Sequence, residues 1–185
     1  MFKNFYPWAH VGSVFDIDYD QLLRNGFRAL IFDIDNTLVH HGDDSTQEVD
    51  ALFIRLHDTG FKTVLLTNNS RSRVERFIKN IDTQYVCEAN KPARDGYIKA
   101  LEISGISREE TVCIGDQLFS DILGANKCGI PCILVDYIRR ENESRIGIKR
   151  HLEKIILKFY RNNRKYFNRL GKIEISEASS KNAME

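Results

Sequence analysis

The sequence predicts an α/β fold in which helices cover both faces of a parallel sheet. Short apolar runs alternate along the chain with helical patterns of about 10–15 residues, which is typical of βαβ units. Neither an internal repeat nor a long linker interrupts this alternation before residue 139. The chain has 185 residues, 42% of them hydrophobic and 29% charged, which is enough for a real core. The composition excludes collagen-like, low-complexity and largely disordered proteins.

Five strands are predicted from continuous apolar runs, each flanked on both sides by turn residues. Such runs are typical of strands buried on both faces of a sheet. The first run passes directly into an acidic residue, Asp33. The predicted strands are 28–34, 61–67, 84–88, 111–115 and 132–135.

Four helices are predicted between and after these strands. A capping box at Ser45 to Glu48 begins the first, and Gly60 ends it. Ser72 with Glu75 begins the second, and Pro92 occupies the first turn of the third. The inward positions are Val49, Leu52, Phe53 and Leu56 in the first helix and Val74, Phe77 and Ile78 in the second, and the last two helices span Pro92–Ser104 and Leu118–Lys127.

The formal net charge of +1 conceals a strong segregation of charge along the chain. Residues 1–138 carry a net charge of −6, residues 139–172 of +9, and residues 173–185 of −2. We therefore expect an acidic α/β domain over 1–138, a basic helical extension over 139–172 and a flexible tail over 173–185.

The basic extension has the pattern of an amphipathic helix over 148–170. Its cationic side chains fill much of the surface outside an apolar stripe of 3.6-residue period, so an anionic membrane surface is one candidate partner. Docking of the stripe on the body of the protein and binding of RNA are the alternatives. The stripe comprises Ile148, Leu152, Ile155, Ile156, Phe159, Tyr160, Phe167 and Leu170.

Polar residues follow the predicted strands at their carboxyl ends, where ligands bind in parallel sheets. Carboxylates gathered at one edge repel one another, so they are usually accompanied by a cation, and oxygen-only ligands suit Mg²⁺. Any one aspartate alone could equally cap a helix or a turn. The residues at consecutive strand ends are Asp33, Asp35, Thr67, Asn68, Lys91, Asp116 and, five residues further on, Asp121.

These residues resemble the motifs of the haloacid dehalogenase-like (HAD) superfamily. Asp33-Ile34-Asp35-Asn36-Thr37 resembles its D-x-D-x-T signature, and Thr67, Lys91-Pro92 and Gly115-Asp116 follow in the superfamily's order. The lead-in Pro7 to Gly26 and the run Gly115 to Asn126 are similar to those of the YqeG-type HAD phosphatases. The resemblance covers about residues 5–140 and implies a Rossmannoid three-layer sandwich.

The resemblance implies a phosphomonoester phosphatase, a hydrolase that forms an aspartyl-phosphate intermediate. Asp33 would be the nucleophile, and Asp35 would protonate the leaving oxygen and then activate water. Thr67 and Asn68 would bind phosphoryl oxygens, and Lys91 would neutralise the phosphoryl group.

A magnesium ion is implied by the same resemblance. Asp33, the main-chain carbonyl of Asp35 and Asp116 would hold Mg²⁺, with Asp121 as an outer-sphere partner. His40 and His41 are expected to be solvated. Arg71 is the arginine of its helix that could reach a phosphate.

Chain length predicts that no large cap domain covers the site. Between Thr37 and Thr67 lie 29 residues, and between Thr67 and Lys91 lie 23, which one loop, one helix and one strand consume. We therefore expect an open site for a large substrate: a protein, a nucleic acid end or a lipid head group. YqeG-type proteins are also similar to mitochondrial phosphatidylglycerophosphate phosphatases, which together with the basic helix favours phosphatidylglycerophosphate.

Other function classes remain open on the sequence. A soluble, protein or nucleic-acid phosphoester is the alternative substrate, and an RNA- or ribosome-associated factor without enzymatic activity would use the basic helix alone. A phospho-receiver domain also combines acids, a Thr and a Lys, but it lacks a D-x-D pair after its opening strand.

The four cysteines point to a reducing compartment. None forms a C-x-x-C pair, and Cys87 and Cys113 lie within apolar runs, as expected of buried thiols. No apolar run is long enough to span a bilayer, and no secretory signal pattern begins the sequence. We expect a cytoplasmic protein, peripheral to the membrane if the basic helix binds it.

Overall fold

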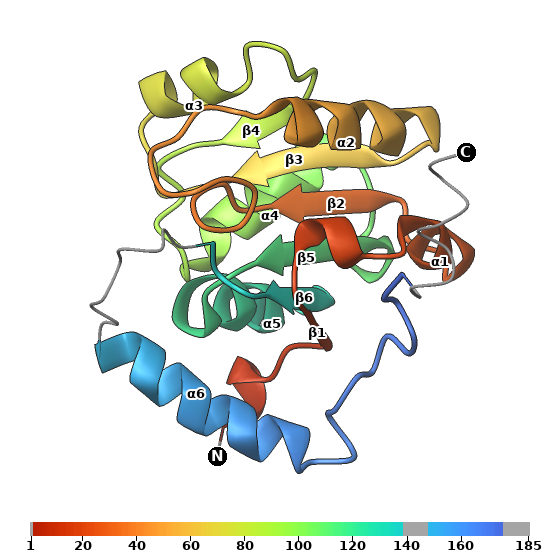
Figure 1. Cartoon of the computed structure of the whole chain (residues 1–185), viewed down its shortest axis with the longest axis vertical. Helices are drawn as coiled ribbons and strands as arrows, with labels where there is room; N and C mark the ends of the chain where they lie inside the picture. Colours follow the sequence, from red (N-terminus) through yellow and green to blue (C-terminus); the bar gives the residue numbers. More distant parts are fainter. Residues whose placement is uncertain (1, 139–147, 176–185) are drawn as a thin grey trace.

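The computed structural model describes residues 2–138 and 148–175 and contains one six-stranded parallel sheet (Figure 1). The strand order is β1-β6-β5-β2-β3-β4, so the predicted α/β class is confirmed. The two central strands, β2 and β5, are buried along their whole length, as their continuous apolar sequences predict. The strands are β1 Ala9–Val11, β2 Ala29–Phe32, β3 Lys62–Leu66, β4 Gln84–Val86, β5 Thr111–Gly115 and β6 Cys132–Val135.

Strand β1 was not predicted from the sequence. It has three residues and pairs in parallel with β6, with Ala9 opposite Ile133 and Val11 opposite Val135. A run this short has no measurable periodicity, and its strand state depends on the edge that β6 provides.

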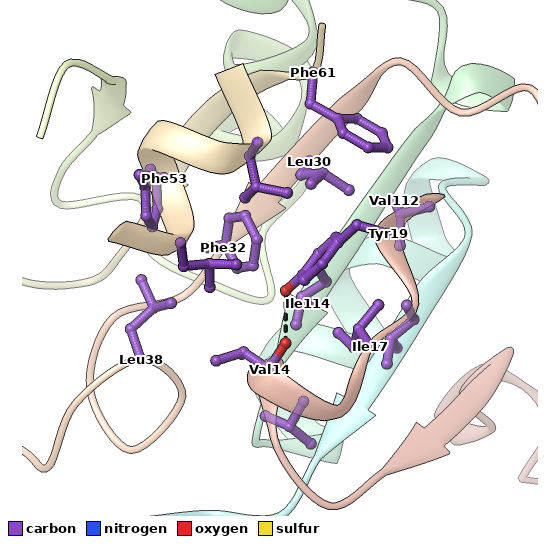
Figure 2. Packing of buried hydrophobic residues seen from close by; sticks show 14 of the residues in the cluster. Val14, Ile17, Tyr19, Leu30, Phe32, Leu38, Phe53, Phe61, Val112 and Ile114 are labelled. Carbon is purple, nitrogen blue, oxygen red and sulfur yellow. Dashed lines mark hydrogen bonds between the residues drawn. The ribbon is translucent and has the colours of Figure 1, made fainter. Parts of the chain in front are cut away.

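One face of the sheet is covered by α1, α2 and α3 (Figure 1). Leu30 and Phe32 point to this face and the intervening Ile31 to the other, which is the period of two of a strand. The Tyr19 hydroxyl in this core donates a 2.8 Å hydrogen bond to the Val14 carbonyl (Figure 2). The helices are α1 Tyr19–Arg24, α2 Gln47–Asp58 and α3 Arg71–Phe77.

The opposite face is covered by α4 and α5, and α6 lies beyond α5, at the β1 end of the sheet (Figure 1). Gly124 of α5 lies against the ring of Tyr97 of α4, where a Cβ atom would overlap the ring, so these two helices need a glycine at this contact. The helices are α4 Arg94–Ser104, α5 Leu123–Cys128 and α6 Ile148–Arg161. The short turns are η1 Lys3–Phe5, η2 Val14–Asp16, η3 Arg108–Glu110 and the π-helical η4 Leu118–Ile122.

Three helices begin at residues other than those expected. Helix α2 is capped by Thr46, whose Oγ1 accepts from the Val49 amide, because the Ser45 hydroxyl binds Asp50 instead. Helix α3 begins after Ser70, two residues before the expected Ser72. Helix α4 begins at Arg94, because Pro92 lies in the loop that presents Lys91.

The predicted helix 118–127 consists of two parts. Its first turn is the π-helix η4, and α5 continues it to Cys128 before Gly129, in the left-handed conformation, ends it.

The predicted basic helix ends earlier than its apolar stripe implies. Helix α6 stops at Arg161, where Asn162 and Asn163 follow and the Asn163 side chain accepts from the Lys165 amide in a turn. Ile156, Tyr160 and Leu170 are buried against the body, whereas Leu152, Ile155, Phe159 and Phe167 are exposed. Residues 139–147 of the predicted extension lie outside the described residues.

The chain after α6 crosses back to the first face of the sheet. Ile173 is buried, its carbonyl accepts from the Asp18 amide, and Glu174 pairs with Ile17 in an antiparallel bridge. Residues 173–175 of the predicted flexible tail are therefore part of the packed body, and 176–185 lie outside the described residues.

Among the described helices, none is long and apolar enough to cross a bilayer. The four cysteines are free thiols, three buried and one, Cys87, half-buried.

Candidate active site

The predicted site residues lie at the carboxyl edge of the sheet because neighbouring strands end level with one another. Phe32 of β2 is opposite both Leu65 of β3 and Ile114 of β5. Asp33 directly follows β2, and its amide donates a 3.0 Å hydrogen bond to the Ile114 carbonyl. The loops after these three strands thus bring Asp33, Thr67 and Asp116 to one place, and all three are buried.

Lys91 connects two separate parts of the site, Asp33 and Asp121. Its Nζ donates to Asp33 Oδ1 at 2.6 Å and to Asp121 Oδ1 at 2.7 Å, and its side chain is buried. Asn68 fixes the main chain at this point, since its Oδ1 accepts from the Lys91 amide at 2.6 Å and its Nδ2 donates to the Lys91 carbonyl at 3.3 Å. The Asn68 side chain therefore holds the loop of Lys91.

Three carboxylates form a buried cluster around this lysine. One oxygen each of Asp33, Asp116 and Asp121 lies within 4.8 Å of the other two. Burial, together with the charges of Asp121 and Asp116, raises the pKa of Asp33 to about 7 although Lys91 opposes the shift. Burial and Asp121 likewise raise the pKa of Asp116 to about 6, against Arg150. The cluster is thus short of positive charge.

A cation fits this cluster chemically. Three buried carboxylates face two cationic side chains, Lys91 and Arg150, and the donor atoms are all oxygen. Hard divalent ions prefer such ligands, and a bound cation would lower the raised pKa values.

Asp121 lies in this cluster because the residue before Asp116 is a glycine. A Cβ atom on Gly115 would lie 2.5 Å from Asp121 Cβ and 2.7 Å from Asp121 Oδ2. The Asp121 carboxylate also accepts from the Gln117 amide at 3.1 Å, which closes the turn after β5.

The Asp35 carboxylate is not one of the three in the cluster and is bound by a different set of donors. It accepts from Asn69 Nδ2 at 2.9 Å, from Arg73 Nη2 at 3.0 Å and from the Gly42 amide at 3.2 Å, and His41 Nδ1 lies 3.0 Å away. Burial raises the pKa of Asp35, but these hydrogen bonds and the Arg73 charge outweigh it and hold the pKa below its usual range.

Asn69 also binds the predicted phosphate ligand Thr67. The Thr67 Oγ1 accepts from the Asn69 side chain at 2.9 Å and from the Asn69 amide at 3.2 Å. Because these two hydrogen bonds occupy both acceptor positions of Thr67 Oγ1, its hydroxyl hydrogen can be donated to another group.

Two arginines at the site were not found by sequence reasoning. Arg73 binds Asp35 and the Asp43 carbonyl, whereas the expected Arg71 is exposed and pairs with Glu75. Arg73 could have been preferred to Arg71 as a site residue only if the start of the helix after Ser70 had been known. Arg150 of α6 binds Asp116, and no pattern within α6 distinguishes it from the other basic residues there.

A cavity of about 420 Å³ adjoins the site on the α6 side. Asp116 and Arg150 form its wall toward the carboxylate cluster, while apolar, cationic and acidic side chains share the remainder. It is lined by His10, Asp116, Leu118, Leu134, Asp136, Tyr137, Arg150, Glu153, Lys154, Leu157 and Arg161.

The expectation that no domain is inserted between the motifs agrees with the structure. The residues between Thr37 and Thr67 form a loop, α2 and β3, and those between Thr67 and Lys91 form α3, β4 and loops. All of these residues are described.

Comparison with known proteins identifies the family. Residues 43–129 match the model of the haloacid dehalogenase-like hydrolases. The "Probable phosphatase YqeG" of Bacillus subtilis is 30% identical over 156 residues, which cover 84% of this chain and 91% of that protein. The fold resembles an uncharacterized protein from Listeria monocytogenes (TM-score 0.51, 15% identity), covering 74% of this chain and 100% of that one. A HAD phosphatase from Thermococcus onnurineus has a TM-score of 0.47 at 17% identity, and the match covers 70% of this chain and 98% of that one. The chain thus belongs to the haloacid dehalogenase-like hydrolases and is a phosphatase related to YqeG.

Proposed function

We propose that this phosphatase hydrolyses a phosphomonoester through an aspartyl-phosphate on Asp33 and depends on Mg²⁺. The observation that carries the proposal is the double ion pair of Lys91 with Asp33 and Asp121, beside Asp116 and Thr67. A cationic side chain, a hydroxyl donor and a buried carboxylate thus lie at one edge of the sheet, which supports Asp33 as the nucleophile.

In the first step an Asp33 carboxylate oxygen attacks phosphorus, and the bond between phosphorus and the ester oxygen breaks. The departing alkoxide takes a proton from Asp35 and leaves as an alcohol. In the second step water attacks the aspartyl-phosphate, Asp35 accepts its proton, and phosphate leaves with Asp33 regenerated. The lowered pKa of Asp35 favours the ionised carboxylate that the second step needs, and it disfavours the protonated carboxyl that the first step needs.

The phosphoryl oxygens would be bound by Lys91 and by the Thr67 hydroxyl hydrogen. Asn69 orients this hydroxyl through two hydrogen bonds, and Asn68 orients Lys91 through its main chain. These four residues come from the loops after β3 and β4.

HAD phosphatases generally use a divalent metal, and the buried acidic cluster of this chain supports such an ion there. The Asp33 and Asp116 carboxylates and the Asp35 carbonyl would hold Mg²⁺, with Asp121 beside them. When bound, the ion supplies charge that offsets the repulsion between carboxylates and phosphate.

We propose further that the substrate is an anionic phospholipid, phosphatidylglycerophosphate, reached through α6. The side chains of Leu152, Ile155 and Phe159 recur at one-turn spacing and are 48%, 54% and 54% exposed. Lys154, Lys158 and Arg161 are exposed on the same helix, and Lys154 and Arg161 also line the cavity. Each cation near an anionic leaflet contributes about 1 kcal/mol, which makes an anionic membrane surface the complementary partner.

The chemistry is tested with an aryl phosphate in the presence and absence of Mg²⁺. Asp33→Asn should abolish hydrolysis, while Asp82→Asn, an exposed aspartate remote from the edge, should leave it unchanged. Hydrolysis that survives Asp33→Asn, or that needs no divalent ion, contradicts the proposed mechanism.

The substrate is tested with phosphatidylglycerophosphate in anionic vesicles against sugar phosphates, nucleotides and phosphopeptides. The double variant Ile155→Ser/Phe159→Ser should lose vesicle binding and lipid turnover but keep aryl phosphate hydrolysis. The control double variant Ile54→Ser/Ile98→Ser removes two similarly exposed side chains from α2 and α4 and should change neither. Turnover of a soluble ester without lipid turnover overturns the membrane proposal, as does RNA binding by α6.

A further inference from the structure

Helix α6 reaches into the catalytic edge through a single side chain. The Arg150 guanidinium donates from Nη1 to the Asp116 carbonyl at 2.6 Å and from Nη2 to Asp116 Oδ2. The guanidinium fork thus binds both the main chain and the side chain of Asp116. The Asp116 side chain is fully buried beneath this contact.

Arg150 is itself fixed by its surroundings. Glu153, one turn further along α6, accepts from Arg150 Nη1 at 2.9 Å, and the Tyr137 ring lies 4.5 Å from the guanidinium. The second Glu153 oxygen accepts from the Leu118 amide at 2.9 Å. Leu118 begins η4, the turn that carries Asp121, so α6 contacts both Asp116 and the start of η4.

The two oxygens of the Asp116 carboxylate therefore have different environments. Oδ2 is bound to Arg150, whereas Oδ1 lies 3.3 Å from the Thr37 hydroxyl, in the loop that follows Asp33. Rotation of the carboxylate would break the contacts on both sides. The arginine thus holds Oδ1 toward the nucleophile loop.

We infer that Arg150 is a positioning residue for the metal ligand Asp116, so that α6 is part of the catalytic centre. The inference rests on the proposed function of the cluster as a cation site. Arg150 touches neither the phosphoryl group nor the cation in this role. It fixes the direction of the Asp116 carboxylate and the position of η4.

Charge and positioning make opposite predictions for the loss of Arg150. Removing a cation from a cluster of carboxylates strengthens the binding of another cation if charge alone matters. Removing the fork frees the Asp116 carboxylate to rotate and weakens binding if positioning dominates. Outer-sphere partners of metal ligands typically contribute 10- to 100-fold to affinity or activity, and positioning therefore predicts weaker binding.

The test uses Arg150→Met, which keeps the apolar stem, and Arg150→Lys, which keeps the charge without the fork. Mg²⁺ alone is titrated against the thermal midpoint of the full chain, and separately against hydrolysis of an aryl phosphate. Both variants should need roughly tenfold more Mg²⁺ for half-saturation in both titrations. Arg108→Met removes an exposed arginine that also pairs with a neighbouring carboxylate, and it should leave both titrations unchanged.

Chemical rescue separates positioning from a general structural role. Guanidinium ion at low millimolar concentration should restore part of the Mg²⁺ affinity of Arg150→Ala and have no such effect on the wild-type chain. Unchanged or tighter Mg²⁺ binding in the Met and Lys variants overturns the inference, and so does a failure of rescue in a folded variant. The thermal titration reads Mg²⁺ binding without turnover, so failure of the phosphatase mechanism would appear separately, as activity that survives Asp33→Asn.

Discussion

Arg150 binds both the carbonyl and the carboxylate of Asp116, although the two residues lie 34 positions apart in the sequence. Through this contact the most basic segment of the chain touches its most acidic cluster. The charge segregation seen in the sequence therefore has a structural counterpart. The inner face of α6 belongs to the site, and its outer face carries the exposed apolar stripe.

Gly115→Ala should displace Asp121 and abolish activity. The added Cβ would lie 2.5 Å from Asp121 Cβ, and the Asp121 side chain is buried. Overpacking of this kind costs about 1–3 kcal/mol of unfolding free energy. Urea unfolding and aryl phosphate hydrolysis measure the two effects.

The control for this variant is Gly12→Ala. There the new Cβ would approach only the end of the Asp16 side chain, at 2.9 Å, which can swing away. Gly115→Ala that keeps wild-type activity would show that the placement of Asp121 is dispensable.

Lys91→Met should lower activity by about a hundredfold to a thousandfold, because the donor that faces both Asp33 and Asp121 is lost. It should also destabilise the fold by about 3 kcal/mol, since two buried carboxylates lose their partner. Steady-state kinetics and urea unfolding check these values. Lys99→Met, at an exposed position on α4, should match the wild type in both. Activity within tenfold of wild type in Lys91→Met would contradict the role of this lysine.

Arg73→Met should raise the pKa of Asp35, because one of the donors that lower it is lost. The Asp35 pKa is depressed in the folded state, so its ionic stabilisation is present above the ordinary value of 3.8 and is lost as the pH falls through the depressed pKa. The stability lost in Arg73→Met should be about 2 kcal/mol at pH 7 and shrink on acidification. Urea unfolding as a function of pH measures this difference.

The matched control for Arg73 is Arg71→Met, two residues away on α3. Arg71 is exposed and pairs with Glu75 on the surface, so its loss should leave the stability close to that of the wild type, with little change between pH 7 and pH 5. A stability loss in Arg73→Met that stays constant down to pH 3 would show that the pair with Asp35 contributes nothing.

The alternation of apolar strands and amphipathic helices predicted most of the fold, because each signal is local. The apolar runs 28–34 and 111–115 became β2 and β5 with their aspartates at the expected edge. Strand β1 was missed, since three residues become a strand only beside β6. Helix starts at Thr46 and Ser70 were missed by one or two residues, because several hydroxyl residues compete for each cap.

The site was predicted as far as its residues follow strand ends. Asp33, Thr67, Lys91 and Asp116 meet because the parallel register is level. Arg150 could not be predicted, because the sequence does not show which part of the apolar stripe of α6 is buried. Ile156 and Tyr160 pack on the body while Ile155 and Phe159 are exposed, and in this orientation of the helix Arg150 contacts Asp116.

The most direct test of Asp33 as the nucleophile is to trap the phosphoryl group on it. The Asp35→Asn variant, incubated with Mg²⁺ and an aryl phosphate and quenched in acid, should accumulate the aspartyl-phosphate, because water is no longer activated. Peptide mass spectrometry should find one phosphoryl group on Asp33, labile to hydroxylamine and absent from Asp33→Asn/Asp35→Asn. A phosphoryl group on any other residue, or turnover without any labelled Asp33 peptide, would contradict Asp33 as the nucleophile.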